Sequence, residues 1–156
     1  MKLKYRLLFA MISIFFLLAG CGESKELKEF RTGFDSFCSD VARIDASING
    51  IDAAAEDSAL TLLTLLDELD LKFQELAELT IPKEFSYLEE LADEASENMT
   101  LAVENYHHAY EADPYDAASA DIASQYYERA YKRVRYMIIF LHGDVPDDEN
   151  VQILEE

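Results

Sequence analysis

The stretch LKEFRTGFDSFCSDVARIDASINGI, residues 27–51, decides the fold of this chain. Its large apolar side chains recur at spacings of three and four without a miss, at Leu27, Phe30, Phe34, Phe37, Val41, Ile44, Ile48 and Ile51. This period is typical of an amphipathic helix that packs along its whole length. Because Gly33 disfavours a helix by about 1 kcal/mol relative to Ala, we expect fraying or a late start on that side. Asn49-Gly50 predicts the end of the helix.

A second helical segment is expected over residues 54–80. Its main apolar stripe consists of Leu62, Leu66, Leu69, Phe73 and Leu76. Four more leucines widen this stripe, at positions 60, 63, 65 and 71. A face this wide predicts either the most buried helix of the fold or a helix with an additional interface.

Two further segments follow, over residues 83–112 and from 114 to 142, and prolines mark the breaks before them. The third stripe consists of Leu88, Ala92, Ala95, Met99, Ala102, Tyr106 and Ala109. The fourth consists of Ala123, Tyr127, Ala130, Val134, Met137 or Ile138, and Leu141. Pro82 marks one break, and Asp113-Pro114 predicts the N-cap and first residue of the last helix. Gly143 is placed to terminate that helix.

Four such segments predict an all-α protein. Each is about 40 Å long at 1.5 Å per residue, and connections of a few residues force neighbouring helices to run antiparallel. We therefore expect an up-down-up-down antiparallel four-helix bundle over residues 27–143. Residues 144–156 are acidic, contain Pro146 and lose the period, which predicts a disordered tail; an alternative is weak docking through Val151, Ile153 and Leu154.

The N-terminal residues form a different kind of segment. Lys2, Lys4 and Arg6 precede an apolar run, residues 7–18, that only Ser13 interrupts. This run is too short to span a bilayer, which takes about 20 residues, so a cleavable secretory signal is favoured over a transmembrane anchor.

The end of that run, Leu18-Ala19-Gly20-Cys21, resembles the bacterial lipobox. The resemblance implies that residues 1–20 are a lipoprotein signal peptide and that the Cys21 thiol carries a diacylglyceryl group with palmitate-like chains. Residues 21–26 would then be the lipidated cysteine and a short tether, on the extracytoplasmic face of the cell membrane. The alternative is an ordinary secretory signal with a chance cysteine. The remainder resembles small helical lipoproteins of bacteria in architecture alone, without a specific family.

The charge of the chain restricts its partners. The formal net charge is −19, and all 32 acidic residues but only 10 of the 13 basic ones lie from Cys21 onward, so that part carries −22. Nucleic acid binding is excluded because it requires a basic surface. Flat contact with anionic lipid is disfavoured as well, so we expect the bundle to stand off the membrane.

Two local features each leave two interpretations open. With Cys21 lipidated, Cys38 is expected to be a small buried hydrophobe; the alternative is an intermolecular disulfide or a reactive thiol. A basic stretch on the fourth helix lies level with acidic residues of the third, which predicts cross-helix ion pairs; the alternative is a site for an anionic ligand. The basic stretch is Arg129, Lys132, Arg133 and Arg135, and the acidic residues are Glu90, Asp93, Glu94 and Glu97.

The bundle topology places the Asn49-Gly50 and Asp113-Pro114 turns at the end remote from Cys21, where we expect a partner to dock. Seven of the eight tyrosines from Cys21 onward lie between Tyr106 and Tyr136. Tyrosine is enriched at protein interfaces. The candidate partner surface is Tyr110, Tyr115, Tyr126 and Tyr131, with simple rim packing as the alternative.

The sequence contains few motifs that are typical of enzymes or cofactor sites. Glu104 and His107 fit the Glu-x-x-His spacing of di-iron bundles, but only one copy is present, so they are weak metal candidates and we expect no metal or other cofactor. Cys-x-x-Cys-His, a nucleophile elbow and a phosphate loop are all missing from the sequence, so an enzyme is not expected. The predicted function is a lipid-anchored, non-catalytic interaction module for an envelope protein or peptide. The alternative is a small-ligand or metal-binding helical bundle.

Overall fold

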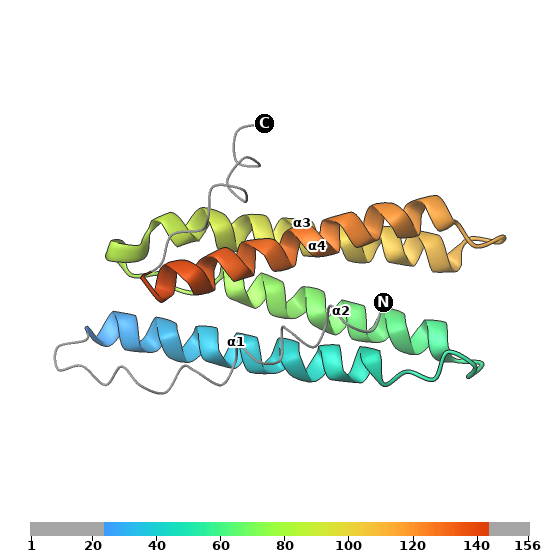
Figure 1. Cartoon of the computed structure of the whole chain (residues 1–156), viewed down its shortest axis with the longest axis horizontal. Helices are drawn as coiled ribbons and strands as arrows, with labels where there is room; N and C mark the ends of the chain where they lie inside the picture. The colour runs from blue at the N-terminus through green and yellow to red at the C-terminus, as the bar shows by residue number, and fades with distance from the viewer. Residues whose placement is uncertain (1–23, 144–156) are drawn as a thin grey trace.

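The computed structural model describes residues 24–143 as an all-α bundle of four long helices (Figure 1). They are α1 (Lys25–Asn49), α2 (Ser58–Ala77), α3 (Tyr87–Glu111) and α4 (Ala117–Leu141), and a short 3₁₀ turn, η3 (Lys83–Phe85), precedes α3. Residues 1–23, with the predicted signal peptide and Cys21, and residues 144–156, with the predicted disordered tail, lie outside the described residues. Within the described part of the chain, no helix is both long and apolar enough to cross a membrane.

Successive helices run in opposite directions, as the short connections predict. The connection between α1 and α2 and the turn between α3 and α4 lie at one end of the bundle, on the right in Figure 1. We call this the distal end. The start of α1, the connection between α2 and α3 and the end of α4 lie at the opposite end, which we call the proximal end. The predicted up-down-up-down order is therefore confirmed.

The core consists of the predicted apolar stripes. The aromatic residues of α1 are buried, and Phe37 packs edge-on against Phe73 of α2, with ring centroids 5.2 Å apart. α3 and α4 bury alanines instead, which lets their backbones approach closely, and these two helices make the most extensive contact in the bundle. Backbones of α1 and α4 approach each other at fewer points, because large side chains lie between these helices.

The prediction that Gly33 would delay or fray α1 is wrong. The helix begins at Lys25, where the Ser24 side chain caps it by accepting a hydrogen bond of 3.1 Å from the Leu27 N–H. A Cβ atom at position 33 would lie 2.8 Å from Cδ2 of Leu79. Gly33 therefore lets the Leu79 side chain pack directly on the α1 backbone.

The second helix is shorter than the predicted 54–80. Asp52 organises a turn ahead of α2, since its carboxylate accepts a 3.0 Å bond from the Ala54 N–H and its carbonyl accepts one from Ala55. Leu63, not Leu62, occupies the buried stripe, with 7% of its surface exposed. The wide leucine face does not make α2 fully buried either, because its leucines at positions 60 and 71 are 69% and 57% exposed.

The starts of the last two helices also differ from the prediction. The third segment opens with η3 before α3 begins at Tyr87. The fourth helix begins at Ala117, with Asp116 as N-cap; Asp113 and Pro114 lie in the turn, joined by a cis peptide bond. Gly143 does follow the end of α4, at a φ of 80° that favours glycine.

Candidate functional site

The turn between α3 and α4 exposes a pair of tyrosines at the distal end. Tyr110 and Tyr115 are 37% and 52% exposed, and their rings meet edge to face with centroids 5.2 Å apart. This arrangement is favourable for aromatic rings and keeps each ring ordered at the surface. Partial burial and the neighbouring Tyr115 raise the pKa of the Tyr110 hydroxyl. Both residues were predicted as partner contacts, and the structure brings them together, with Tyr110 near the end of α3 and Tyr115 in the turn that follows it.

Asp116 fixes the conformation of this turn. Its Oδ1 accepts hydrogen bonds from the backbone N–H groups of Ala118 and Ser119 at 3.0 and 3.3 Å, and its Oδ2 accepts one from the Ser119 hydroxyl at 2.7 Å. The side-chain and backbone bonds from Ser119 lower the pKa of the Asp116 carboxyl. A backbone bond of 3.1 Å from the Asp116 N–H to the Ala109 carbonyl closes the turn. The tyrosine pair therefore sits on an ordered support.

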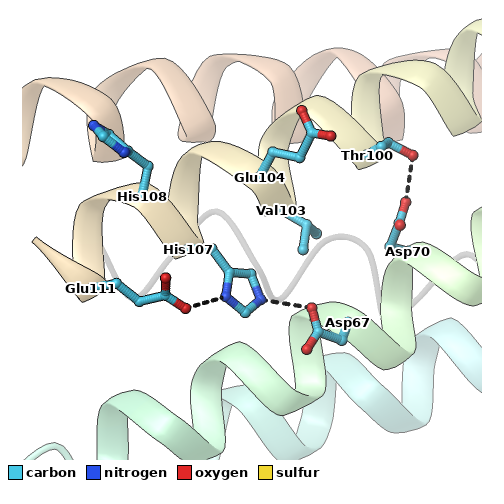
Figure 2. A pocket seen from close by; sticks show the side chains of 8 residues that line it. All are labelled: Asp67, Asp70, Thr100, Val103, Glu104, His107, His108 and Glu111. Atoms are coloured by element: carbon cyan, nitrogen blue, oxygen red, sulfur yellow. Dashed lines mark hydrogen bonds and ion pairs between the residues drawn. The ribbon is translucent and has the colours of Figure 1, made fainter.

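A shallow groove lies beside this turn, between α2 and α3. It is a solvent-open hollow of about 480 Å³, and four carboxylates line it (Asp67, Asp70, Glu104 and Glu111). Figure 2 shows His107 between two of them: its Nε2 lies 2.7 Å from Asp67 Oδ1 on α2, and its Nδ1 lies 2.9 Å from Glu111 Oε1 on its own helix. Hydrogen bonds to Glu111 and Asp67 raise the pKa of His107. His107 therefore links α2 to α3.

The weak metal candidates, Glu104 and His107, do not converge on one point. Glu104 lines the same groove, but its carboxylate points away from the His107 ring (Figure 2). The imidazole instead uses both nitrogens on other carboxylates. Among residues 24–143, no group of three or more His, Cys, Asp or Glu side chains is arranged to hold a metal ion.

The other two predicted surface tyrosines behave differently from the exposed pair. Tyr126 is partly buried against the core, and Arg129 lies over its ring at 5.3 Å. Tyr131 is partly buried and packs within the bundle, in line with the packing alternative. Its ring packs against Phe73 of α2 with centroids 5.7 Å apart, and its hydroxyl points inward to a carboxylate of α1.

That carboxylate is Asp45, which forms a polar cluster between α1 and α4. Tyr131 and Tyr127 both donate hydrogen bonds to its Oδ1, at 2.7 and 3.0 Å. The two phenol rings stack at 4.7 Å, and their oxygens lie 3.1 Å apart. Burial raises the pKa of Asp45, although the hydroxyl bonds act in the opposite direction. The cluster links α1 to α4, two helices whose backbones approach each other at few points.

One residue of the basic stretch of α4, Arg133, pairs with α3 as the ion-pair interpretation predicts. Arg133 is 8% exposed and binds the Glu94 carboxylate through its Nε. Its Nη1 is buried without a hydrogen-bond partner among the described residues. Lys132 lies over the Tyr136 ring at 5.7 Å. Cys38 is partly buried, and burial raises the pKa of its thiol to about 12, in line with a packing role.

Sequence reasoning missed the Asp45 cluster and the link that His107 makes between α2 and α3. Asp45 follows Val41 by four residues and precedes Ile48 by three, so the periodicity placed it on the apolar face of α1. This spacing, together with the four-residue step between Tyr127 and Tyr131, was the signal that could have revealed the cluster. A comparison of the chain with protein-family models, with curated proteins and with solved structures finds no match in any of the three.

Proposed function

We propose that this chain is a lipid-anchored lipoprotein of the cell envelope that acts as a non-catalytic interaction module. The lipobox cysteine would hold it to the extracytoplasmic face of the membrane. The distal end would present the exposed tyrosine pair to an envelope protein or peptide. One juxtaposition carries this proposal: the lipidation motif precedes one end of the bundle and the ordered, exposed aromatic pair lies at the other.

The length of the tether supports this orientation. Cys21 precedes the first residue of α1, Lys25, by four positions, which limits the span between them to about 14 Å. α1 is 25 residues long, so the distal end lies roughly 37 Å from the start of the helix. The proximal end would therefore stay close to the lipid, and the tyrosine pair would face away from it.

The chemistry of the distal end favours binding over catalysis. Its polar groups have structural partners: Asp116 caps α4, and His107 joins α2 to α3. The side chains left facing solvent include the two phenol rings, which offer apolar area and a polar tip at little cost in conformational entropy.

Anchoring is tested with the intact chain and a Cys21→Ala variant in a bacterial host fed an alkyne-labelled palmitate. We expect the intact chain to carry the label and to be recovered in the membrane fraction. Protease added outside the cytoplasmic membrane should cleave it. The variant should carry no label and leave the membrane fraction. Recovery of unlabelled variant entirely in membranes, or label that persists without Cys21, would contradict the anchor.

Docking is tested in the same cells by placing a photo-crosslinking amino acid at position 110 or 115. Position 87 is the matched control, because Tyr87 is a tyrosine exposed to 49% at the proximal end. A discrete crosslinked product is expected from the distal positions and not from position 87. Crosslinking from position 87 alone would place the partner at the wrong end and refute the docking part of the proposal.

A further inference from the structure

The acidic residues of the bundle are balanced by basic ones at the proximal end and not at the distal end. The distal region, residues 44–68 and 101–128, contains 12 Asp and Glu and no Lys or Arg. The remaining described residues contain 13 Asp and Glu and all 10 of the Lys and Arg. The formal charges are therefore −12 and −3, with His neutral. The formal negative charge of the described residues is therefore concentrated in the distal region, which contains the tyrosine pair, although Glu68 of this region pairs with Arg43.

We infer that the occupant of the distal end is a cationic segment, a stretch of Lys or Arg side chains on an extracytoplasmic partner, which docks on the Tyr110–Tyr115 pair and its flanking carboxylates. This inference rests on the proposed function and names the chemistry of the partner. Its components are two exposed rings and the carboxylates carried by the same turn, with Glu111 and Asp113 directly between the rings in sequence.

The rings supply the contact that holds a cation in place. A guanidinium or ammonium group within about 6 Å of a tyrosine ring is attracted by the ring quadrupole, and more strongly when it is desolvated. The edge-to-face packing of Tyr110 and Tyr115 already orders both rings, so binding loses little further side-chain entropy. The same chemistry occurs within the domain, where Arg129 lies over Tyr126 and Lys132 over Tyr136.

Charge excludes the other classes of occupant. An anionic partner would be repelled by the unbalanced carboxylates. A purely apolar partner would have to remove Asp113 and the His107-paired Glu111 from water without offering either a new partner, which is unfavourable. A cationic segment instead pairs these carboxylates while its methylene stems lie on the rings.

The His107 groove extends this acidic surface along α3. Glu111 follows Tyr110 at the end of α3 and also lines the groove, and its side chain is 67% exposed. Asp67 lies across the groove on α2, with a side chain that is 55% exposed (Figure 2). A second cationic side chain of the same segment would reach these carboxylates when the first lies on the rings.

The test is calorimetric titration of the full-length lipidated protein, held in micelles of a nonionic detergent, with a decapeptide of alternating Arg and Gly. A decapeptide of alternating Gln and Gly is the uncharged probe. Two distal variants are compared: Tyr110→Ala with Tyr115→Ala, and Glu111→Gln with Asp113→Asn. The matched proximal control combines Tyr87→Ala with Glu89→Gln and Glu90→Gln, which removes an exposed ring and two neighbouring acids from the balanced end.

We expect either distal variant to weaken binding of the Arg peptide about tenfold, and the proximal control to change it less than twofold. The charge variant should also reduce the dependence of affinity on salt. If the distal and proximal variants lost affinity for the Arg peptide equally, net charge alone would explain the binding and the inference would be overturned. No loss of affinity in either set would overturn it as well. Equal binding of the uncharged peptide would overturn the cationic partner while leaving distal docking intact. Membrane anchoring does not enter this titration, so a failed anchor and a failed partner class remain distinguishable.

Discussion

Removing the hydroxyl of Tyr131 should destabilise the bundle by about 1.5–3 kcal/mol, because that hydroxyl donates a 2.7 Å hydrogen bond to a largely buried carboxylate. Tyr131→Phe keeps the ring, its contact with Phe73 and its stacking on Tyr127. The loss therefore reports the hydrogen bond and the carboxylate that it solvates. For a domain of this size the melting temperature should fall by roughly 4 °C per kcal/mol.

The Tyr127 hydroxyl allows a second test, of whether the two hydroxyls act together. Tyr127 donates to the same Oδ1 at 3.0 Å, so each single Phe variant leaves Asp45 one donor and the double variant leaves it neither. We expect Tyr127→Phe with Tyr131→Phe to cost more than the sum of the single changes, by about 1 kcal/mol. Groups that act independently would give a simple sum.

The pH dependence of the free energy of unfolding tests whether ionised Asp45 is the cause of this cost. Burial raises the folded-state pKa of Asp45, the tyrosine hydroxyls lower it, and their removal should raise it further. A carboxyl with a raised pKa contributes stability that is fully present below its unfolded pKa, about 3.9, and that is lost as the pH rises through the folded value. The cost of the double variant should therefore be largest at neutral pH and shrink at about pH 3.

Urea unfolding followed by circular dichroism at 222 nm, at both pH values, provides the measurement. Tyr87→Phe is the matched control, since it removes a hydroxyl from a tyrosine that is 49% exposed, and it should change the free energy of unfolding by less than about 0.5 kcal/mol. A double-variant cost that is the same at both pH values, or no larger than that of the control, would refute the role assigned to Asp45.

Three smaller predictions concern other contacts. His107→Gln should remove a stabilising contribution that is full below about pH 6.5 and is lost as the pH rises through the raised pKa of His107; unfolding of both proteins from pH 5 to 9 checks this, and parallel curves would contradict it. Gly33→Ala should be close to neutral alone and stabilising by about 1 kcal/mol in a Leu79→Ala background, where its Cβ no longer meets the leucine; equal effects in both backgrounds would count against that contact. Cys38, with a pKa of about 12, should react with iodoacetamide at pH 8 much more slowly in the folded protein than in urea, and equal rates would show it to be accessible.

The helices were predictable because their burial follows a simple period. Phe30, Phe34 and Phe37 are buried where the spacing places them, and the third stripe is equally accurate. The helix starts were less predictable, because several residues compete to cap them. Asp113 and Asp116 are both suitable N-caps by residue type. Only the folded turn shows that Asp116 reaches the backbone N–H groups of the helix.

The candidate site was predictable only in part. Tyr110 and Tyr115 flank a turn, and residues in turns are expected at the surface. The inward orientation of Tyr131 was not predictable. Because tyrosine has an apolar body and a polar tip, its position in the helical period does not show which end of the side chain faces solvent. Its orientation depends on Asp45, 86 residues away in the sequence, and that partner follows from the alignment of α1 with α4.

The charge distribution agrees with the direction in which the lipid would hold the bundle. Under the proposed anchor at Cys21, the nearly balanced proximal end lies next to the membrane, and the distal region, with its formal charge of −12, extends from the middle of the bundle to roughly 37 Å from the start of α1. At physiological salt the Debye length is about 8 Å, so an anionic lipid surface would exert little force on the distal carboxylates at that distance. The opposite orientation would bring the more acidic half of the bundle against the same surface. A tether at the start of α1 thus minimises repulsion from lipid and leaves the negative field of the distal region available to a cationic partner.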